Sequence, residues 1–252
     1  MVLFERPSGI IVACDFINLE RLGSVIGHVD NIEGVVGYSI GPTYSADNSL
    51  NNVFRCMSSM TGKPILYNHQ AAGSGSPAIM GDFVSMVSGV GFSGAVITPY
   101  AGPDASMKLI SKLREKNVEP IVCGSDNVLD LTEGDSLDRG EDRIGYLHDN
   151  APYLMFRDGA EFGADNFFLP AARPSEIPHF KAAVEDGIKR SGRKSDPSFI
   201  VFGIGRQGGS LEPALMALGD VKRKYALIGD AVYNAADIRK AAEEFCRKIA
   251  TL

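Results

Sequence analysis

The chain has 252 residues, a formal net charge of −6 at pH 7 and 44% hydrophobic residues. This acidic balance argues against a nucleic-acid partner bound through a broad basic face. No run of about eighteen apolar residues occurs, so no membrane-spanning helix is expected, and the start of the sequence lacks the pattern of an export signal. Its cysteines are scattered without metal-site or disulfide spacing, and together these features predict a cytoplasmic protein with reduced thiols.

Short apolar, β-branched runs alternate along the chain with longer segments of helical period. We expect strands at residues 10–15, 34–40, 64–69, 95–99, 120–125, 167–170, 199–203 and 225–229. Helices are expected at about 18–28, 45–60, 78–90, 104–116, 145–163, 175–190, 210–219 and 235–250. Eight strand–helix units predict an α/β protein, a single (β/α)8 TIM barrel over residues 1–252. An open doubly wound sheet is the alternative, but no dinucleotide-binding fingerprint opens the chain.

A segment rich in Asp, Glu and Gly, at about residues 126–146, interrupts this alternation after the fifth strand. It should rise over the C-terminal face of the barrel, where a long loop acts as a lid, as a binding loop or as a solvated surface. Its acidic residues do not have the spacing of a helix–loop–helix calcium site. No metal site is predicted.

A glycine-rich loop follows the seventh predicted strand. Residues 203–209 hold four glycines together with Arg206 and Gln207, and the next helix begins at about residue 210. Glycines let the backbone approach an anion closely, and unpaired N–H groups at a helix start attract negative charge. The loop is therefore predicted to grip a phosphate, with a simple tight turn as the alternative.

Polar residues end several other predicted strands. Asp15 ends the first, Asn68 and His69 end the third, and Gly229-Asp230 follow the eighth. Together with the glycine loop, their order and spacing resemble the orotidine 5′-phosphate decarboxylase family across nearly the whole chain. This resemblance implies a homodimeric barrel that needs no cofactor, with a ligand that carries a ribose phosphate and a pyrimidine.

The resemblance also assigns roles to individual residues. Asp15 matches an Asp that contacts the ribose, and Gln207, Gly208 and Gly209 match the phosphate-binding segment. Ser125 lies where the family reads the pyrimidine with a hydroxyl-bearing segment, although the local match there is poor.

The chain departs from the family at the positions of its catalytic residues. The family uses a Lys on strand 2 and an Asp, Lys, Asp set on strand 3, and a Lys protonates the carbon left by carbon dioxide. The corresponding positions here are Ser39, Asn68, Ala71 and Gly75. An alanine cannot deliver a proton, and neither an amide nor a glycine orients one as a carboxylate does.

The cation that grips the phosphate is also replaced. The family places an Arg after the glycine that ends strand 8, where this chain has Asp230. Arg206 either supplies the missing cation or faces solvent.

The sequence leaves three interpretations of the function open. The protein binds a phosphorylated ligand without catalysis, or it catalyses another reaction with Asn68, His69 or Gln70 as polar participants, or it is a working decarboxylase. His69 is either an acid or base at the rim or a packed structural side chain, and Lys63 is expected at the opposite mouth of the barrel. Loss of the parent decarboxylation is the favoured interpretation.

Overall fold

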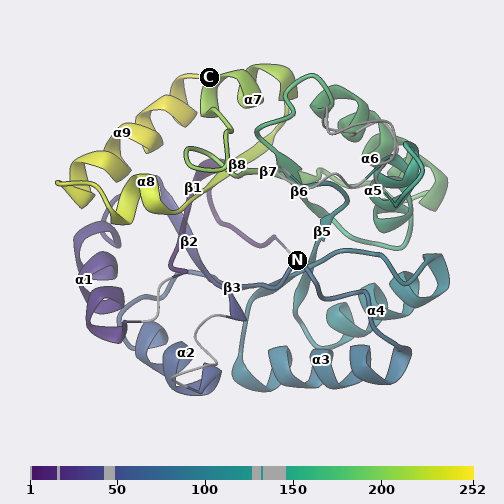
Figure 1. Ribbon diagram of the computed structural model, residues 1–252, viewed down its shortest axis with the longest axis horizontal. Coiled ribbons are helices and arrows are strands. Elements are labelled where there is room, and N and C mark those ends of the chain that lie inside the picture. Colours follow the sequence, from purple (N-terminus) through teal and green to yellow (C-terminus); the bar gives the residue numbers. More distant parts are fainter. Residues whose placement is uncertain (1, 16–17, 43–48, 127–131, 133–145) are drawn as a thin grey trace.

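A computed structural model describes residues 2–15, 18–42, 49–126, 132 and 146–252. Its eight parallel strands pair in chain order, and β8 pairs with β1 to close a barrel (Figure 1). The strands are β1 Ser8–Ala13, β2 Val35–Ile40, β3 Ile65–Asn68, β4 Gly94–Ile97, β5 Glu119–Cys123, β6 Asn166–Pro170, β7 Ser198–Phe202 and β8 Arg223–Ile228. The predicted (β/α)8 barrel is therefore confirmed.

Helices follow the strands and cover the outside of the barrel (Figure 1). They are α1 Leu19–Val29, α2 Leu50–Ser58, α3 Pro77–Val90, α4 Pro103–Glu115, α5 Ala151–Glu161, α6 Ile177–Ser191, α7 Leu211–Leu218, α8 Asp230–Tyr233 and α9 Ile238–Thr251. Most of the acidic segment predicted at 126–146 lies outside the described residues, as do residues 45–48 of the helix expected at 45–60, and α2 begins at Leu50.

Two helix boundaries differ from the prediction. The helix expected from residue 145 begins at Ala151, because Pro152 has no N–H and fits only in the first turn of a helix. The helix expected at 235–250 begins at Ile238, after Asp237 accepts a hydrogen bond from the Lys240 N–H. The short helix α8 lies just before it and was not predicted.

Alternation along the strands divides the apolar residues into two clusters. One fills the inside of the barrel and includes Leu66, Val96 and Ile121. The other lies between the sheet and the helices and includes Tyr38 and Ile40. Polar side chains that point inward near the strand ends therefore face the mouth of the barrel.

An irregularity in the pairing of β1 with β2 sets the orientation of β2. The register shifts between Ile10, opposite Val35, and Ile11, opposite Gly37. Since Tyr38 and Ile40 pack outward, Ser39 between them points into the barrel, where its side chain is fully buried. The shift thus directs a polar side chain toward the site described below.

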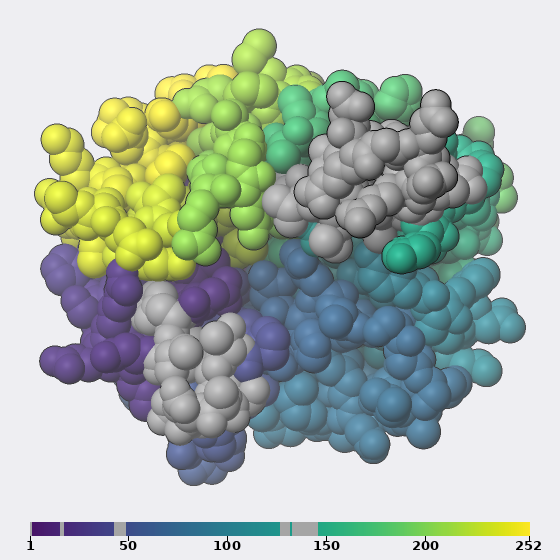
Figure 2. Space-filling view, in the orientation of Figure 1, coloured from purple at the N-terminus to yellow at the C-terminus, as the bar shows by residue number. Residues whose placement is uncertain are grey.

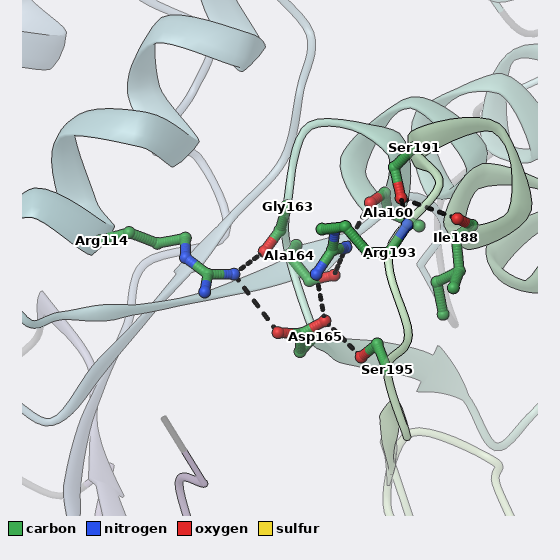
Figure 3. Close-up of polar contacts among 9 residues, drawn as sticks. All are labelled: Arg114, Ala160, Gly163, Ala164, Asp165, Ile188, Ser191, Arg193 and Ser195. Carbon is green, nitrogen blue, oxygen red and sulfur yellow. Dashed lines mark hydrogen bonds and ion pairs between the residues drawn. The ribbon is translucent and has the colours of Figure 1, made fainter.

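A polar network joins three helical segments at the N-terminal end of the barrel (Figure 3). Asp165, just before β6, accepts hydrogen bonds from Arg193 at 2.9 Å and Ser195 at 2.6 Å, and Arg114 of α4 lies 3.3 Å away. Arg193 also donates to the Ala160 carbonyl oxygen at 2.7 Å. Burial raises the pKa of Asp165, but these hydrogen bonds and the two cations outweigh it and hold the pKa below its ordinary value.

Candidate functional site

A cavity of about 220 Å³ opens at the C-terminal ends of the strands. It is bordered by the segments that follow β1, β3, β7 and β8, far apart in sequence. The residues that line it are Ala13, Asp15, Asn68, Gln70, Phe202, Gly203, Ile204, Arg206, Gln207, Leu227, Gly229, Asp230 and Tyr233. In the space-filling view, the yellow-green residues after β7 adjoin the yellow residues around α8 and the purple residues after β1 (Figure 2). Catalytic and binding residues of (β/α)8 barrels lie at this face.

The glycine loop forms one wall of the cavity through its own backbone hydrogen bonds. The N–H of Gly205 donates to the Gly209 carbonyl oxygen at 2.9 Å, Gly208 donates to Gly205 at 2.8 Å, and Gly209 donates to Gly203 at 3.0 Å. Gly203, Gly205 and Gly208 have φ values of 79°, 88° and 85°, which other residues rarely adopt. The N–H groups of Gly208 and Gly209 are therefore used within the loop, whereas Arg206 and Gln207 are exposed at its tip.

Asp15 lines the same cavity, two residues beyond β1. The residue is exposed to solvent, but its carboxyl group lies deep enough in the protein for burial to raise its pKa to about 6. A hydrogen bond from the Gly41 N–H acts in the opposite direction. A Cβ at position 41 would lie 3.0 Å from the Asp15 Oδ1, so glycine leaves room for the carboxylate. The carboxylate can accept hydrogen bonds from ligand hydroxyl groups.

Ser39 and Asn68 are inward-facing polar residues of β2 and β3, and Asn68 lines the cavity. Ser39 pairs with Leu66 across β2 and β3, and Asn68 lies two residues further along β3 on the same face. The Ser39 Oγ and the Asn68 Oδ1 are buried and make no hydrogen bond within the described chain. Buried polar atoms are normally paired. Asn68 lines the cavity, so its Oδ1 suits a polar group of a ligand, whereas Ser39 lies beneath the lining.

Helix α8 brings Tyr233 into the cavity wall, which the sequence analysis missed. Arg21 of α1 donates a hydrogen bond to the Tyr233 carbonyl oxygen at 3.1 Å and another to the Asn234 side chain, and its guanidinium lies 5.2 Å from the centre of the Tyr233 ring. Burial raises the pKa of Tyr233, and the carboxylates of Asp230 and Asp15 raise it further. A signal for this residue was its place three positions after Asp230, in the segment after the last strand.

Arg206 is paired with Asp230. The Arg206 Nε lies 3.4 Å from the Asp230 Oδ2, and the two side chains are 85% and 31% exposed. The interaction joins the glycine loop to the first residue of α8. Arg206, the candidate substitute cation, thus contacts Asp230, which stands where the family has its Arg.

Other residues singled out by the sequence lie outside the cavity lining. The His69 ring packs edge-on against Tyr67 and Phe83, with ring centres 5.6 and 6.2 Å apart, and burial lowers its pKa. Ser125 is buried, with its carbonyl oxygen near the Cys123 thiol. The other candidate site residues that do not line the cavity are Ser39, Ala71, Gly75, Gly208 and Gly209.

Every lysine of the sequence falls within the described residues, and none lines the cavity. Lys63 precedes β3 at the N-terminal end of the barrel, as expected. There its Nζ donates to the carbonyl oxygens of Asp30 and Ile32. Arg206 is thus the cation in the lining of the described cavity.

The described residues lack two further features. They contain no group of three or more His, Cys, Asp or Glu side chains arranged to hold a metal ion. None of the helices among them has the length and apolar character needed to cross a bilayer.

A comparison with known protein families gives no match. A stretch of 80 residues is 30% identical to an orotidine 5′-phosphate decarboxylase of Pyrococcus abyssi, and it covers 32% of this chain and 32% of that protein. The match thus spans about a third of the length of this curated relative.

Solved structures resemble nearly the whole chain. A structure of orotidine 5′-monophosphate decarboxylase from Methanocaldococcus jannaschii, complexed with the inhibitor BMP, has a TM-score of 0.77 at 15% identity and covers 97% of this chain and 99% of its own. The Pyrococcus horikoshii enzyme has a TM-score of 0.71 at 19% identity, with coverages of 96% and 100%. The Sulfolobus solfataricus enzyme has a TM-score of 0.68 at 15% identity, with coverages of 98% and 99%. The chain therefore has the barrel fold of the orotidine 5′-monophosphate decarboxylases.

Proposed function

We propose that the protein is a divergent member of the orotidine 5′-phosphate decarboxylase family that binds a phosphorylated, nucleotide-like ligand. The observation that carries the proposal is the convergence of Asp15, Arg206 and Gln207 on one cavity at the C-terminal face. Barrels of this type often bind phosphate with the loops after strands 7 and 8 and a short extra helix, which is the position of α8. Asp15 accepts hydrogen bonds from the sugar, and Arg206 and Gln207 hold the phosphate.

The parent decarboxylation is lost in this proposal. Its chemistry needs an ammonium group that protonates the carbon left by carbon dioxide, next to carboxylates that position it. Ser39 and Asn68 occupy inward positions where that network is expected, and no lysine lines the described cavity. A hydroxyl or amide group of ordinary acidity does not donate a proton to carbon as an ammonium does.

Two forms of this function remain. The protein binds its ligand without reaction, or Asn68 and Gln70 position a ligand for a different reaction. The third interpretation, a working decarboxylase of UMP synthesis, requires either another alignment of strand 3 with the family or charged groups from a partner subunit. Turnover of the parent substrate distinguishes that reading from the first two.

Mixing the purified protein with orotidine 5′-monophosphate is expected to leave the ultraviolet absorbance of the substrate unchanged. General acid–base groups contribute roughly 10²- to 10⁴-fold in rate, and the cavity lining contains no lysine to act as one. A steady loss of absorbance that an Asp15→Ala variant abolishes would identify a working decarboxylase and contradict the proposed loss.

Uridine 5′-monophosphate should raise the melting temperature of the protein. A ligand at one hundred times its Kd stabilises the folded state by about 2.7 kcal/mol, which corresponds to roughly 5–10 °C for a chain of this length. The double variant Arg206→Ala/Gln207→Ala should lose most of this shift, because both side chains line the cavity. The control is Arg190→Ala, whose side chain is exposed on α6 beside Asp186. An unchanged shift in the double variant would place the ligand elsewhere.

A homodimer completes the proposal. Exposed apolar side chains lie near the starts of α3, α4 and α5, with Ile79, Met107 and Leu154 exposed by 62%, 43% and 41%. Burial of such side chains between two copies is favourable. In sedimentation experiments the unmodified chain should be dimeric and Met107→Glu should shift it toward monomer. The matched change Met216→Glu, at an exposed methionine of α7, should leave it dimeric. A monomeric unmodified chain would refute the dimer.

A further inference from the structure

The proposed phosphate site contains a carboxylate as well as a cation. Asp230 and Arg206 both line the cavity, and their side chains lie 3.4 Å apart. The Arg206 side chain is 85% exposed, whereas that of Asp230 is 31% exposed. Asp230 is thus the more enclosed of the two, and an oxyanion held by Arg206 and Gln207 lies close to it.

In the described part of the chain, Arg206 is the cation that pairs with Asp230. Arg206 approaches from the glycine loop, Tyr233 belongs to the same helix, and Asp15 approaches from the end of β1. Arg21 of α1 is hydrogen-bonded to the Tyr233 carbonyl oxygen and to Asn234. The cavity lining therefore brings two carboxylates and one guanidinium to an anionic ligand.

This arrangement distinguishes oxyanions by their protons as well as their charges. An ionised carboxylate accepts hydrogen bonds and cannot donate them. A phosphate monoester that keeps one proton has a P–OH group that donates to a carboxylate, in a strong charge-assisted bond. A fully ionised phosphate monoester has no such donor and carries a second negative charge, and a sulfate ester has one charge but no donor.

We propose that Asp230 makes the cavity selective for a phosphate monoester that retains a proton, over sulfate esters and over the doubly ionised phosphate. The proton lies between a phosphate oxygen and the Asp230 carboxylate, while Arg206 and Gln207 hold the other phosphate oxygens. This inference rests on the proposed function, since it requires the phosphate to bind beside the glycine loop. It adds the protonation state of the ligand to that function.

The test compares uridine 5′-monophosphate with uridine 5′-sulfate by calorimetric titration between pH 5 and pH 8. Since the second phosphate pKa is about 6, the affinity for the phosphate ester should rise as the pH falls through that value. The sulfate ester should bind more weakly than the phosphate ester at pH 5. An Asp230→Asn variant, whose amide can donate, should bind the sulfate ester about tenfold more tightly or better and lose the preference for low pH.

Asp15 titrates in the same range, since its pKa is raised to about 6 by burial. The sulfate ester has no proton to lose in this range, so its pH dependence reports the groups of the protein, Asp15 among them. The difference between the two esters then reports the proton of the ligand. An Asp230→Ser variant provides a second removal of the carboxylate, and its melting temperature shows whether the barrel is intact.

If the unmodified protein bound the two esters equally, and Asp230→Asn did not change either affinity, the selectivity would be overturned. The proposed function would remain in place. Failure of both esters to bind to the unmodified protein and to both Asp230 variants would overturn the two together. A fall in the affinity for the phosphate ester relative to that for the sulfate ester, as the pH is lowered, would also contradict the inference.

Discussion

Gly187→Ala is expected to lower the free energy of unfolding by about 3 kcal/mol and the melting temperature by about 10 °C. Gly187 lies in α6, where a Cβ would collide with the Arg157 carbonyl oxygen and lie 2.8 Å from the Ala160 Cβ. Both of these atoms belong to α5. Because a backbone carbonyl cannot rotate away as a side chain does, the two helices would have to separate. Urea denaturation at pH 7 measures the effect.

Gly27→Ala is the matched control for this substitution. Gly27 lies in α1, and a Cβ there would meet nothing within 4 Å. Alanine favours a helix over glycine by about 0.5–1 kcal/mol, so this variant should be slightly more stable than the unmodified protein. A Gly187→Ala variant that unfolds at the same urea concentration as the unmodified protein would contradict the close approach of α5 and α6.

Asp165→Asn should lower the free energy of unfolding by about 2 kcal/mol at pH 7, between the values of exposed and fully buried ion pairs. The substitution removes the charge that Arg114 and Arg193 share at the N-terminal end of the barrel, and the three side chains are 22–35% exposed. Ser195 also loses an ionised acceptor. The measurement is the urea midpoint of each variant as a function of pH.

The effect of Asp165 should depend on pH with a defined sign. Its pKa is lower in the folded protein than the ordinary value of about 3.9, so its stabilisation is present above that value and is lost as the pH falls toward the folded pKa. The unmodified protein and Asp165→Asn should therefore converge as the pH decreases from about 5 to 3.

Asp196→Asn removes a carboxylate whose pair with Lys222 is exposed, with side chains 59% and 76% exposed. This control should change the stability by less than about 0.5 kcal/mol. A constant difference between the unmodified protein and Asp165→Asn from pH 7 to pH 3 would show that the charge of Asp165 does not account for its effect.

The sequence predicted the barrel because each strand is a short apolar run between helical segments, and closure follows from eight such units. It also predicted that Asp15, Asn68 and Gln207 lie at one rim, since the ends of parallel strands in a barrel meet at the same face. These residues line one cavity in the structure. Their roles in binding or catalysis remain predictions.

Side-chain direction and loop pairing were harder to predict. His69 follows Asn68, and alternation turns adjacent side chains to opposite faces, so His69 packs on rings outside the cavity lining. The pairing of Arg206 with Asp230 joins two loops distant in sequence, and no local periodicity encodes such a contact. Helix α8 is too short to produce a periodic signal, and Tyr233 was missed for this reason.

The way in which the glycine loop is held has a consequence for divergence among barrels. Its shape is held by backbone hydrogen bonds among Gly203, Gly205, Gly208 and Gly209, and the pair that Arg206 makes with Asp230 is largely exposed on the Arg206 side and adds little to stability. Arg206 and Gln207 can therefore be exchanged for other residues at little expense to folding. Single substitutions at these two positions can therefore change which ligand the site binds during evolution, while the barrel fold is retained.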